Sequence, residues 1–296
     1  MSVLLPGVLA VVMFGLGLGL EVLDFERVIR EPKAVLVALA IQCLALPCLC
    51  FALLFAFQVP GELAVGMMIL AASPGGTMAN IFSHFSGGDV ALNVTLTAVN
   101  CVTSVATLPI VVNLSLAHFI DDEQSMGIHY SEMVRVIATI LVPVVIGMFV
   151  RRRSDRLATR LTQPLKRASA VILAIVILFA LVGNLSVLRE HFVTVGSAAL
   201  ALCCLSMLLG YWAPRAARVE RSQAVASTFE IGIHNATLAV VVALSILDND
   251  QMAVSPAIYG VVMYLPAFVA YLLLRRGGAT SEPLKGAGTT VRPPLA

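Results

Sequence analysis

The stretch FEIGIHNAT, residues 229–237, places the carboxylate of Glu230 inside one of the most apolar parts of this chain. The run LAVVVALSIL follows it directly. Moving a carboxylate out of water is costly unless a cation or hydrogen-bond donors stabilise its charge. An ionisable group in such surroundings is therefore a candidate functional residue, and the question is what stabilises it.

Amide and hydroxyl side chains gather in the apolar segments that flank Glu230 and a second unusual motif, Pro74-Gly75-Gly76. A carboxylate surrounded by neutral oxygens is the ligand set that a small hard cation requires once it has lost its water. A cation or a proton at Glu230 is the leading hypothesis, and the alternative is an internal pair with His234 one turn on. The polar side chains are Gln42, Ser73, Thr77, Asn80, Asn93, Thr95, Thr97, Asn100, Asn235 and Thr237, of which 93, 97 and 100 share one helical face.

The composition predicts a membrane protein: 59% of the residues are hydrophobic, 12% are charged and the mean hydropathy is +0.96. Soluble domains carry about 25% charged residues. The six cysteines lie in apolar runs without metal-ligand spacing, so neither a zinc nor a redox site is expected. With about 20 apolar residues needed per span, nine segments qualify: 2–22, 34–57, 62–86, 89–117, 132–150, 168–188, 191–212, 222–247 and 252–274.

The fold class predicted from this pattern is an all-α polytopic membrane protein. It comprises a single transmembrane domain over residues 1–276 and a disordered cytoplasmic tail over 277–296. With the N-terminus outside and the spans alternating, 17 of the 19 basic residues fall on the inner side. The excess of basic residues on the cytoplasmic side therefore predicts an outer N-terminus and a cytoplasmic C-terminus.

Two of the predicted spans are interrupted. Pro74-Gly75-Gly76 lies in the middle of the third span, and Gly232 and Asn235 flank His234 in the eighth. Backbone groups freed by such breaks cannot face lipid, so they must line a cavity enclosed by protein. The two spans run in opposite directions five spans apart, which predicts inverted repeats over about 1–117 and 132–275 and a binding site between the breaks.

Two stretches, SPGGTMANIFSHFSGGDVALNVTLTAV and FEIGIHNATLAV, resemble the signature stretches of the bile acid:sodium symporter family. The leading MFGLGLGLEVLDFERVIREPK is similar to that family's early helix and loop, and the resemblance covers about residues 5 to 275. It implies an inverted-repeat transporter with a core domain, a panel domain and two discontinuous helices that cross in the core. This chain resembles the nine-helix form of bacterial relatives, which starts at the family's second helix.

The family couples the uptake of organic anions to two sodium ions near the crossing. By position, the resemblance implies a first sodium site made of Asn80, Asn93, Thr97 and Glu230. It implies a second site made of Gln42, Glu230, the backbone carbonyls near Ile231 and Ile233, and the position of His234. The implied substrate contacts are Thr77 and Asn235.

The chain departs from the family pattern at three positions within or beside these sites. Ala79 stands where the family often has a serine, Asn93 replaces a smaller hydroxyl residue, and His234 stands where a glutamine is usual. The imidazole nitrogen is a poor sodium ligand and can itself be protonated. Two sodium ions, one sodium ion, and one sodium ion with proton sensitivity all stay open.

The sequence thus predicts a secondary transporter rather than an enzyme. It would import an organic anion, bile-acid-like or a smaller carboxylate, by alternating access, with Na⁺ as the coupling ion and no cofactor. A proton-coupled or exporting carrier of the same fold is the alternative. The expected setting is the inner membrane of a bacterial cell, with the lipid bilayer and the organic anion as partners and neither nucleic acid nor an obligate protein partner. A membrane enzyme using Glu230 and His234 is disfavoured because no second catalytic carboxylate accompanies them.

Overall fold

The computed structural model describes residues 4–20, 22–120 and 130–275. The predicted tail over 277–296 and most of the loop over 118–131 lie outside these residues. Within the described ranges, all regular elements are helical apart from one isolated antiparallel bridge between Gly75 and His234. Apolar side chains from most of the helices form one continuous core.

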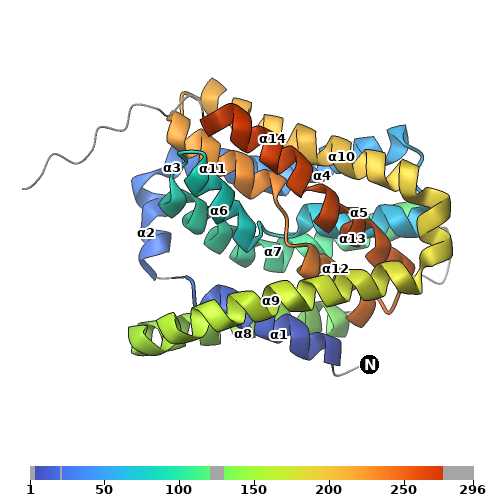
Figure 1. Cartoon of the computed structure of the whole chain (residues 1–296), viewed down its shortest axis with the longest axis horizontal. Coiled ribbons are helices and arrows are strands. Elements are labelled where there is room, and N and C mark those ends of the chain that lie inside the picture. The colour runs from blue at the N-terminus through green and yellow to red at the C-terminus, as the bar shows by residue number, and fades with distance from the viewer. Residues whose placement is uncertain (1–3, 21, 121–129, 276–296) are drawn as a thin grey trace, which may run out of the picture.

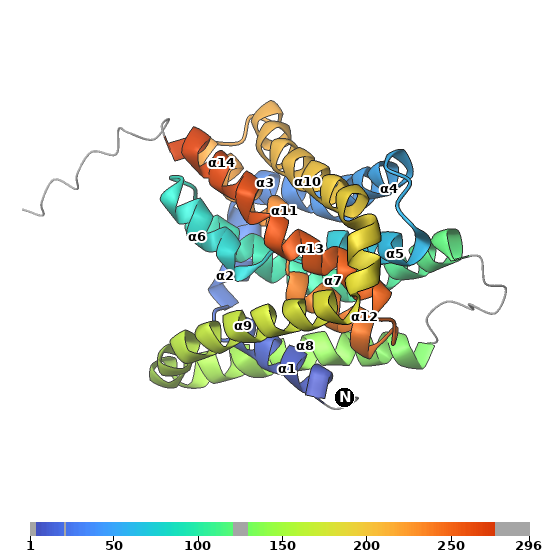
Figure 2. The ribbon, with the colours of Figure 1, turned by 45° about the vertical axis from the view of Figure 1, so that its right-hand side comes forward.

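Three helices form a layer along one side of the molecule, at the bottom of Figures 1 and 2. They are α1 (Leu4–Gly17), α8 (Tyr130–Arg153) and α9 (Asp155–Gly183). The other helices lie above this layer (Figure 1). They are α2 (Val22–Arg30), α3 (Pro32–Ala40), a π-helix (Ile41–Ala45), α4 (Leu46–Ala56), α5 (Gly61–Ala72), α6 (Thr77–Phe85), α7 (Val90–Phe119), α10 (Leu185–Ala216), α11 (Arg221–Gly232), α12 (Ala236–Ser245), a 3₁₀ turn (Gln251–Ala253), α13 (Val254–Val262) and α14 (Tyr264–Arg275).

Four helical stretches of the described chain are long and apolar enough to cross a membrane. They are Pro32–Ala56, Val90–Phe119, Leu185–Ala216 and Gln251–Arg275. Helices also occupy most of each of the nine predicted segments. The prediction of an all-helical membrane protein is therefore confirmed, whereas the number of nine spans stays a prediction.

The boundary between the sixth and seventh predicted segments lies earlier than residues 189–190. Helix α9 ends at Gly183 and α10 begins at Leu185, so Arg189 is within α10. Glycine followed by asparagine favours a helix end, whereas an exposed charged pair continues a helix well. The basic segment 151–167 is helical almost throughout, because only Ser154 separates α8 from α9 and its Oγ accepts from the N–H of Leu157 at 3.3 Å.

Both predicted interruptions are present, and they lie against each other. Helix α5 stops at Ala72 and α6 starts at Thr77, while α11 stops at Gly232 and α12 starts at Ala236. Across the two breaks, the N–H of Gly76 donates to the Ile233 carbonyl at 2.8 Å, and the N–H of Asn235 donates to the Pro74 carbonyl at 3.0 Å. The backbone groups freed by each break are thus satisfied by the other break, as an apolar interior requires.

Different segments of the chain meet at the two ends of the interrupted helices. At one end α2, the turn before α7 and the start of α11 meet, and the N–H of Asp89 donates to the Ser222 carbonyl at 2.9 Å. At the other end Asn249 Nδ2 donates to Glu62 Oε1 at 3.0 Å. Segments predicted to lie on the same side of the membrane therefore meet. Which side is cytoplasmic stays a prediction.

Helices α1 and α8 approach each other through glycines. A Cβ at Gly17 would overlap the backbone of Val144, and a Cβ at Gly147 would lie 2.8 Å from the carbonyl carbon of Gly17. These obstacles are backbone atoms, which cannot rotate away. The small residues therefore set the close contact between the two helices.

We expect Gly147→Ala to lower the melting temperature of the detergent-purified protein. Overpacking against a backbone costs about 1–3 kcal/mol, which outweighs the gain of about 1 kcal/mol in helix propensity. Gly196→Ala in α10 is the control, because its Cβ would meet nothing within 4 Å. Equal melting temperatures for the two variants would contradict this account of the α1–α8 contact.

Candidate functional site

Glu230 is fully buried, and α7 supplies hydrogen-bond donors to both oxygens of its carboxylate. Thr97 Oγ1 donates to Oε2 at 2.7 Å, and Asn100 Nδ2 donates to Oε1 at 3.1 Å. Asn93 Nδ2 lies 3.4 Å from Oε2 and also donates to the Ala226 carbonyl at 2.9 Å. The polar face predicted from the spacing of α7 is therefore turned towards Glu230.

The break between α5 and α6 also reaches this carboxylate. Gly75, in this break, lies directly against the carboxylate of Glu230. A Cβ at position 75 would overlap the carboxylate itself. Only glycine permits this close approach, so the Pro-Gly-Gly motif both interrupts the helix and makes room for the charge.

Several buried amide oxygens near the breaks have no hydrogen-bond partner. Buried polar atoms are nearly always paired, so unpaired oxygens around a carboxylate point to a missing electropositive ligand. Within the described residues, no cluster of three or more His, Cys, Asp or Glu side chains is present. The candidate ligands near the breaks are therefore the amide oxygens and the Glu230 carboxylate. The unpaired oxygens are Gln42 Oε1, Asn80 Oδ1, Asn93 Oδ1 and Asn100 Oδ1.

Only some residues of the predicted first sodium site contact the Glu230 carboxylate. Asn93 and Thr97 contact the Glu230 carboxylate directly. Asn80 lies on α6, one turn beyond the break, and makes no hydrogen bond to Glu230 in the described part of the chain. Asn100 belongs to the predicted polar face but not to the predicted site, and its contact with Oε1 shows that it lies beside the Glu230 carboxylate.

Two side chains of the predicted second site, Gln42 and His234, lie at the backbone carbonyl of Ser73, which the prediction did not include. Gln42 Nε2 donates to this oxygen at 3.1 Å and to the Ala71 carbonyl at 3.2 Å, and His234 Nδ1 lies 3.3 Å from the same Ser73 oxygen. Gln42 sits in the π-helix, a feature that often marks functional positions. Gln42 Oε1 and His234 Nε2 are both buried without partners.

The two predicted backbone ligands of this second site, the carbonyls of Ile231 and Ile233, differ in their surroundings. The Ile233 carbonyl already accepts from Gly76, and Ile231 lies within the last turn of α11. Tyr259 of α13, which no sequence pattern singled out, packs its ring 5.7 Å from that of His234. Its hydroxyl donates to the Gly232 carbonyl at 3.0 Å, which holds the end of α11 beside the break.

The predicted substrate contacts lie at the start of the second half-helices. Asn235 is the N-cap of α12, where its Oδ1 accepts from the N–H of Leu238 at 3.1 Å. Thr77 is the first residue of α6, and its side chain lies outside the described part of the structure. Both helix N-termini thus begin at the breaks, where their partial positive charge favours an anion.

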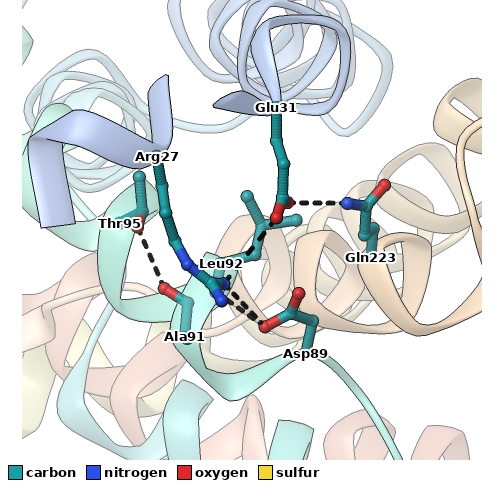
Figure 3. A network of polar contacts seen from close by, with 7 residues as sticks. All are labelled: Arg27, Glu31, Asp89, Ala91, Leu92, Thr95 and Gln223. Atoms are coloured by element: carbon teal, nitrogen blue, oxygen red, sulfur yellow. Dashed lines mark hydrogen bonds and ion pairs between the residues drawn. The ribbon is translucent and has the colours of Figure 1, made fainter. Parts of the chain in front are cut away.

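A polar network that the sequence did not reveal ties α2 to both site helices (Figure 3). Arg27 Nη1 donates to Asp89 Oδ1 at 3.1 Å, and this carboxylate also caps α7 by accepting from the N–H of Leu92 at 2.9 Å. Gln223 Nε2 on α11 donates to Glu31 Oε2 at 2.6 Å. The network therefore fixes the starts of α7 and α11, the two helices that carry the Glu230 cluster.

The fold and the site together define an all-helical membrane protein with a buried, oxygen-lined carboxylate at two paired helix breaks. The model of the sodium bile acid symporter family matches residues 6–191. The chain therefore belongs to the sodium bile acid symporter family. The matched range includes the α5–α6 break and the polar face of α7, and it ends before α11.

Three curated relatives are similar over most of the chain. A sodium-dependent transporter of Bacillus subtilis is 24% identical over 86% of this chain and 77% of its own length. The human ileal sodium/bile acid cotransporter is 26% identical over 92% of this chain and 80% of its own. A probable chloroplastic sodium/metabolite cotransporter of Arabidopsis thaliana is 24% identical over 86% of this chain but only 62% of its own length. The prediction of a transporter rather than an enzyme is confirmed.

We expect Thr97→Val to lower stability in sodium-free buffer. The substitution keeps the shape of the side chain but removes the shortest hydrogen bond to the Glu230 carboxylate, at a cost of about 1–3 kcal/mol. The matched control is Thr107→Val on the same helix, because the Thr107 hydroxyl donates only to the Thr103 carbonyl at 3.2 Å. Thermal unfolding in detergent measures both, and equal losses would contradict a special role for the Thr97 contact.

Proposed function

We propose that this protein is a sodium-coupled symporter that imports an organic anion by alternating access. The observation that supports this proposal best is the fully buried Glu230 carboxylate at two paired helix breaks, with unpartnered amide oxygens nearby. Membership of a sodium symporter family supplies the expected identity of the ion.

The first sodium ion would bind between α7 and the Glu230 carboxylate. Its charge would cancel that of Glu230, and the free Oδ1 atoms of Asn93 and Asn100 would complete its oxygen shell together with Thr97. Asn80 Oδ1 is a further buried ligand within one helical turn of the break. Cation binding would thus hold α7, α11 and the α5–α6 break in one arrangement.

The second site is proposed to bind sodium more weakly. Gln42 Oε1 supplies one free oxygen, but His234 Nε2 offers a nitrogen where oxygen is preferred. The Ile233 carbonyl is already engaged by Gly76, and the Ile231 carbonyl is the remaining predicted backbone ligand. Coupling to one sodium ion therefore fits the side chains of this chain better than coupling to two.

The substrate is proposed to be an organic anion, bile-acid-like or a smaller carboxylate. The N-termini of α6 and α12, at Thr77 and Asn235, would face its negative charge. The names of the human and Arabidopsis relatives include a bile acid and a metabolite, respectively. A proton-coupled or exporting carrier of this fold is the alternative that ion-dependence and transport direction would distinguish.

The proposed architecture is a single transmembrane domain over residues 1–276, with inverted repeats over about 1–117 and 132–275. The layer of α1, α8 and α9 would be the panel, and the remaining helices would be the core. Rigid-body motion of one against the other would alternate access to the site. The distribution of basic residues supports an outer N-terminus and a cytoplasmic C-terminus, and the Bacillus relative supports a bacterial membrane protein, for which the inner membrane is the proposed setting.

We expect the purified protein to bind radioactive sodium at equilibrium and Glu230→Gln to lose most of this binding. Glutamine keeps the shape of the side chain but replaces one acceptor oxygen by an N–H donor and removes the charge that the ion balances. Glu62→Gln is the control, because Glu62 pairs with Asn249 at the end of α5. The proposal fails if wild type binds no sodium, or if both variants bind as wild type does.

We expect His234→Gln to raise the number of sodium ions bound per protein towards two. The substitution replaces a nitrogen ligand by an amide oxygen beside the Ser73 carbonyl and Gln42. His84→Gln, an exposed position on α6, should leave the stoichiometry unchanged. An unchanged or lower stoichiometry in His234→Gln would contradict the account of the second site.

A further inference from the structure

Two serine hydroxyls at the end of α6 have no hydrogen-bond partner although both are buried. Ser83 is 0% exposed and Ser86 is 1% exposed, and neither Oγ makes a hydrogen bond. Several buried hydroxyls in the described spans bond within their own helix: Ser115 Oγ donates to the Val111 carbonyl at 2.6 Å, and Thr228 Oγ1 donates to the Ala224 carbonyl at 2.8 Å. Ser227 Oγ on α11 and Ser245 Oγ on α12 are also unpaired, but they do not lie on α6. The serines of α6 forgo this local bond, which is costly in an apolar interior.

These hydroxyls continue the row of unpaired oxygens that begins at the Glu230 cluster. Asn80 Oδ1, Ser83 Oγ and Ser86 Oγ are spaced three residues apart, so successive members are about 4.5 Å apart along the helix axis. The opposite face of α6 is apolar and exposed, with Ile81 at 47% and Phe85 at 64%. The unpaired oxygens are therefore confined to the face that packs against α7 and α11.

Contacts in this corner link Ser83 to the cation cluster. A Cβ at Gly88 would meet Ser83 Oγ on one side and the backbone nitrogen of Ala226, 3.1 Å away, on the other. The Ala226 carbonyl accepts from Asn93 Nδ2, which also reaches Glu230. Ala226 thus lies between Ser83 and the proposed sodium ligand Asn93, and Ser83 is on the side towards the turn before α7.

The row ends at the turn before α7, beside a charged pair. Asp89 follows Ser86 by three residues, and its carboxylate is paired with Arg27 at 3.1 Å. Arg27 is 34% exposed and Asp89 is 24% exposed, so the pair stands at the edge of the buried region. The Asp89 carboxylate thus supplies further oxygens at the end of the row, and Arg27 neutralises its charge so that it does not hold a cation tightly.

We propose that Asn80, Ser83 and Ser86 form a conduction path for the sodium ion between the Glu230 site and the Arg27–Asp89 end of the molecule. A cation that has lost its water needs an oxygen at each step, and this face of α6 supplies them in sequence. By the predicted orientation, this is the cytoplasmic end, where sodium would leave during import. The inference rests on the proposed function.

Silver ion tests the path, because it is a monovalent cation that reacts with thiols. In a full-length variant whose six native cysteines are replaced by serine or alanine, we expect silver to block the thiols of Ser83→Cys and Ser86→Cys, and sodium to slow the reaction at least several-fold. Alkylation of the remaining thiols after denaturation, followed by mass spectrometry, measures the extent of reaction. Ser206→Cys is the control, because this equally buried hydroxyl is bonded to the Cys203 carbonyl at 2.9 Å and lies on α10.

Equal reactivity at all three positions, or no effect of sodium at Ser83→Cys, would overturn the proposal. A second measurement needs no cysteine replacement: Ser83→Ala with Ser86→Ala should slow sodium exchange across proteoliposomes several-fold, with equilibrium sodium affinity unchanged. Exchange at the wild-type rate would overturn the path while leaving the proposed function intact. Wild-type protein that binds no sodium would overturn both.

Discussion

The structure depends on keeping one carboxylate, that of Glu230, in an interior without water. Its two oxygens accept from donors on α7, and Gly75 of the α5–α6 break lies directly against it, so three separate parts of the chain meet at a single charge. None of these donors carries a positive charge. The cluster satisfies the hydrogen bonds of the carboxylate but leaves its charge unbalanced, and the proposed sodium ion would restore the balance.

The paired breaks are the second requirement of this arrangement. A continuous helix could bring neither the Gly76 N–H nor the Ser73 carbonyl towards another span, because its own backbone bonds would use them. By breaking at the same level, α5–α6 and α11–α12 exchange hydrogen bonds with each other and expose polar backbone to one enclosed region. The Arg27–Asp89 and Glu31–Gln223 contacts then hold the starts of α7 and α11 in register at one end (Figure 3).

The sequence was enough to predict the features that depend on a single segment of the chain. The length of the apolar segments predicted the helices, Pro74-Gly75-Gly76 predicted a break, and the spacing of Asn93 and Thr97 predicted a polar face. It missed features that need two distant segments, such as the Glu31–Gln223 contact, the Tyr259 hydroxyl on the Gly232 carbonyl, and the inclusion of Asn100. The predicted boundary at 189–190 differs from the break at Gly183–Asn184, because an exposed charged pair is compatible with a helix.

The most direct test of the central claim is the melting temperature of the detergent-purified protein in sodium against potassium at equal ionic strength, for wild type and Glu230→Gln. A ligand that binds only the folded state stabilises it by about 2.7 kcal/mol at 100 times its Kd. The account predicts that sodium, and not potassium, raises the melting temperature of wild type and has no effect on Glu230→Gln. If the two salts act alike on wild type, or if sodium stabilises both proteins equally, Glu230 does not bind sodium and the account is wrong.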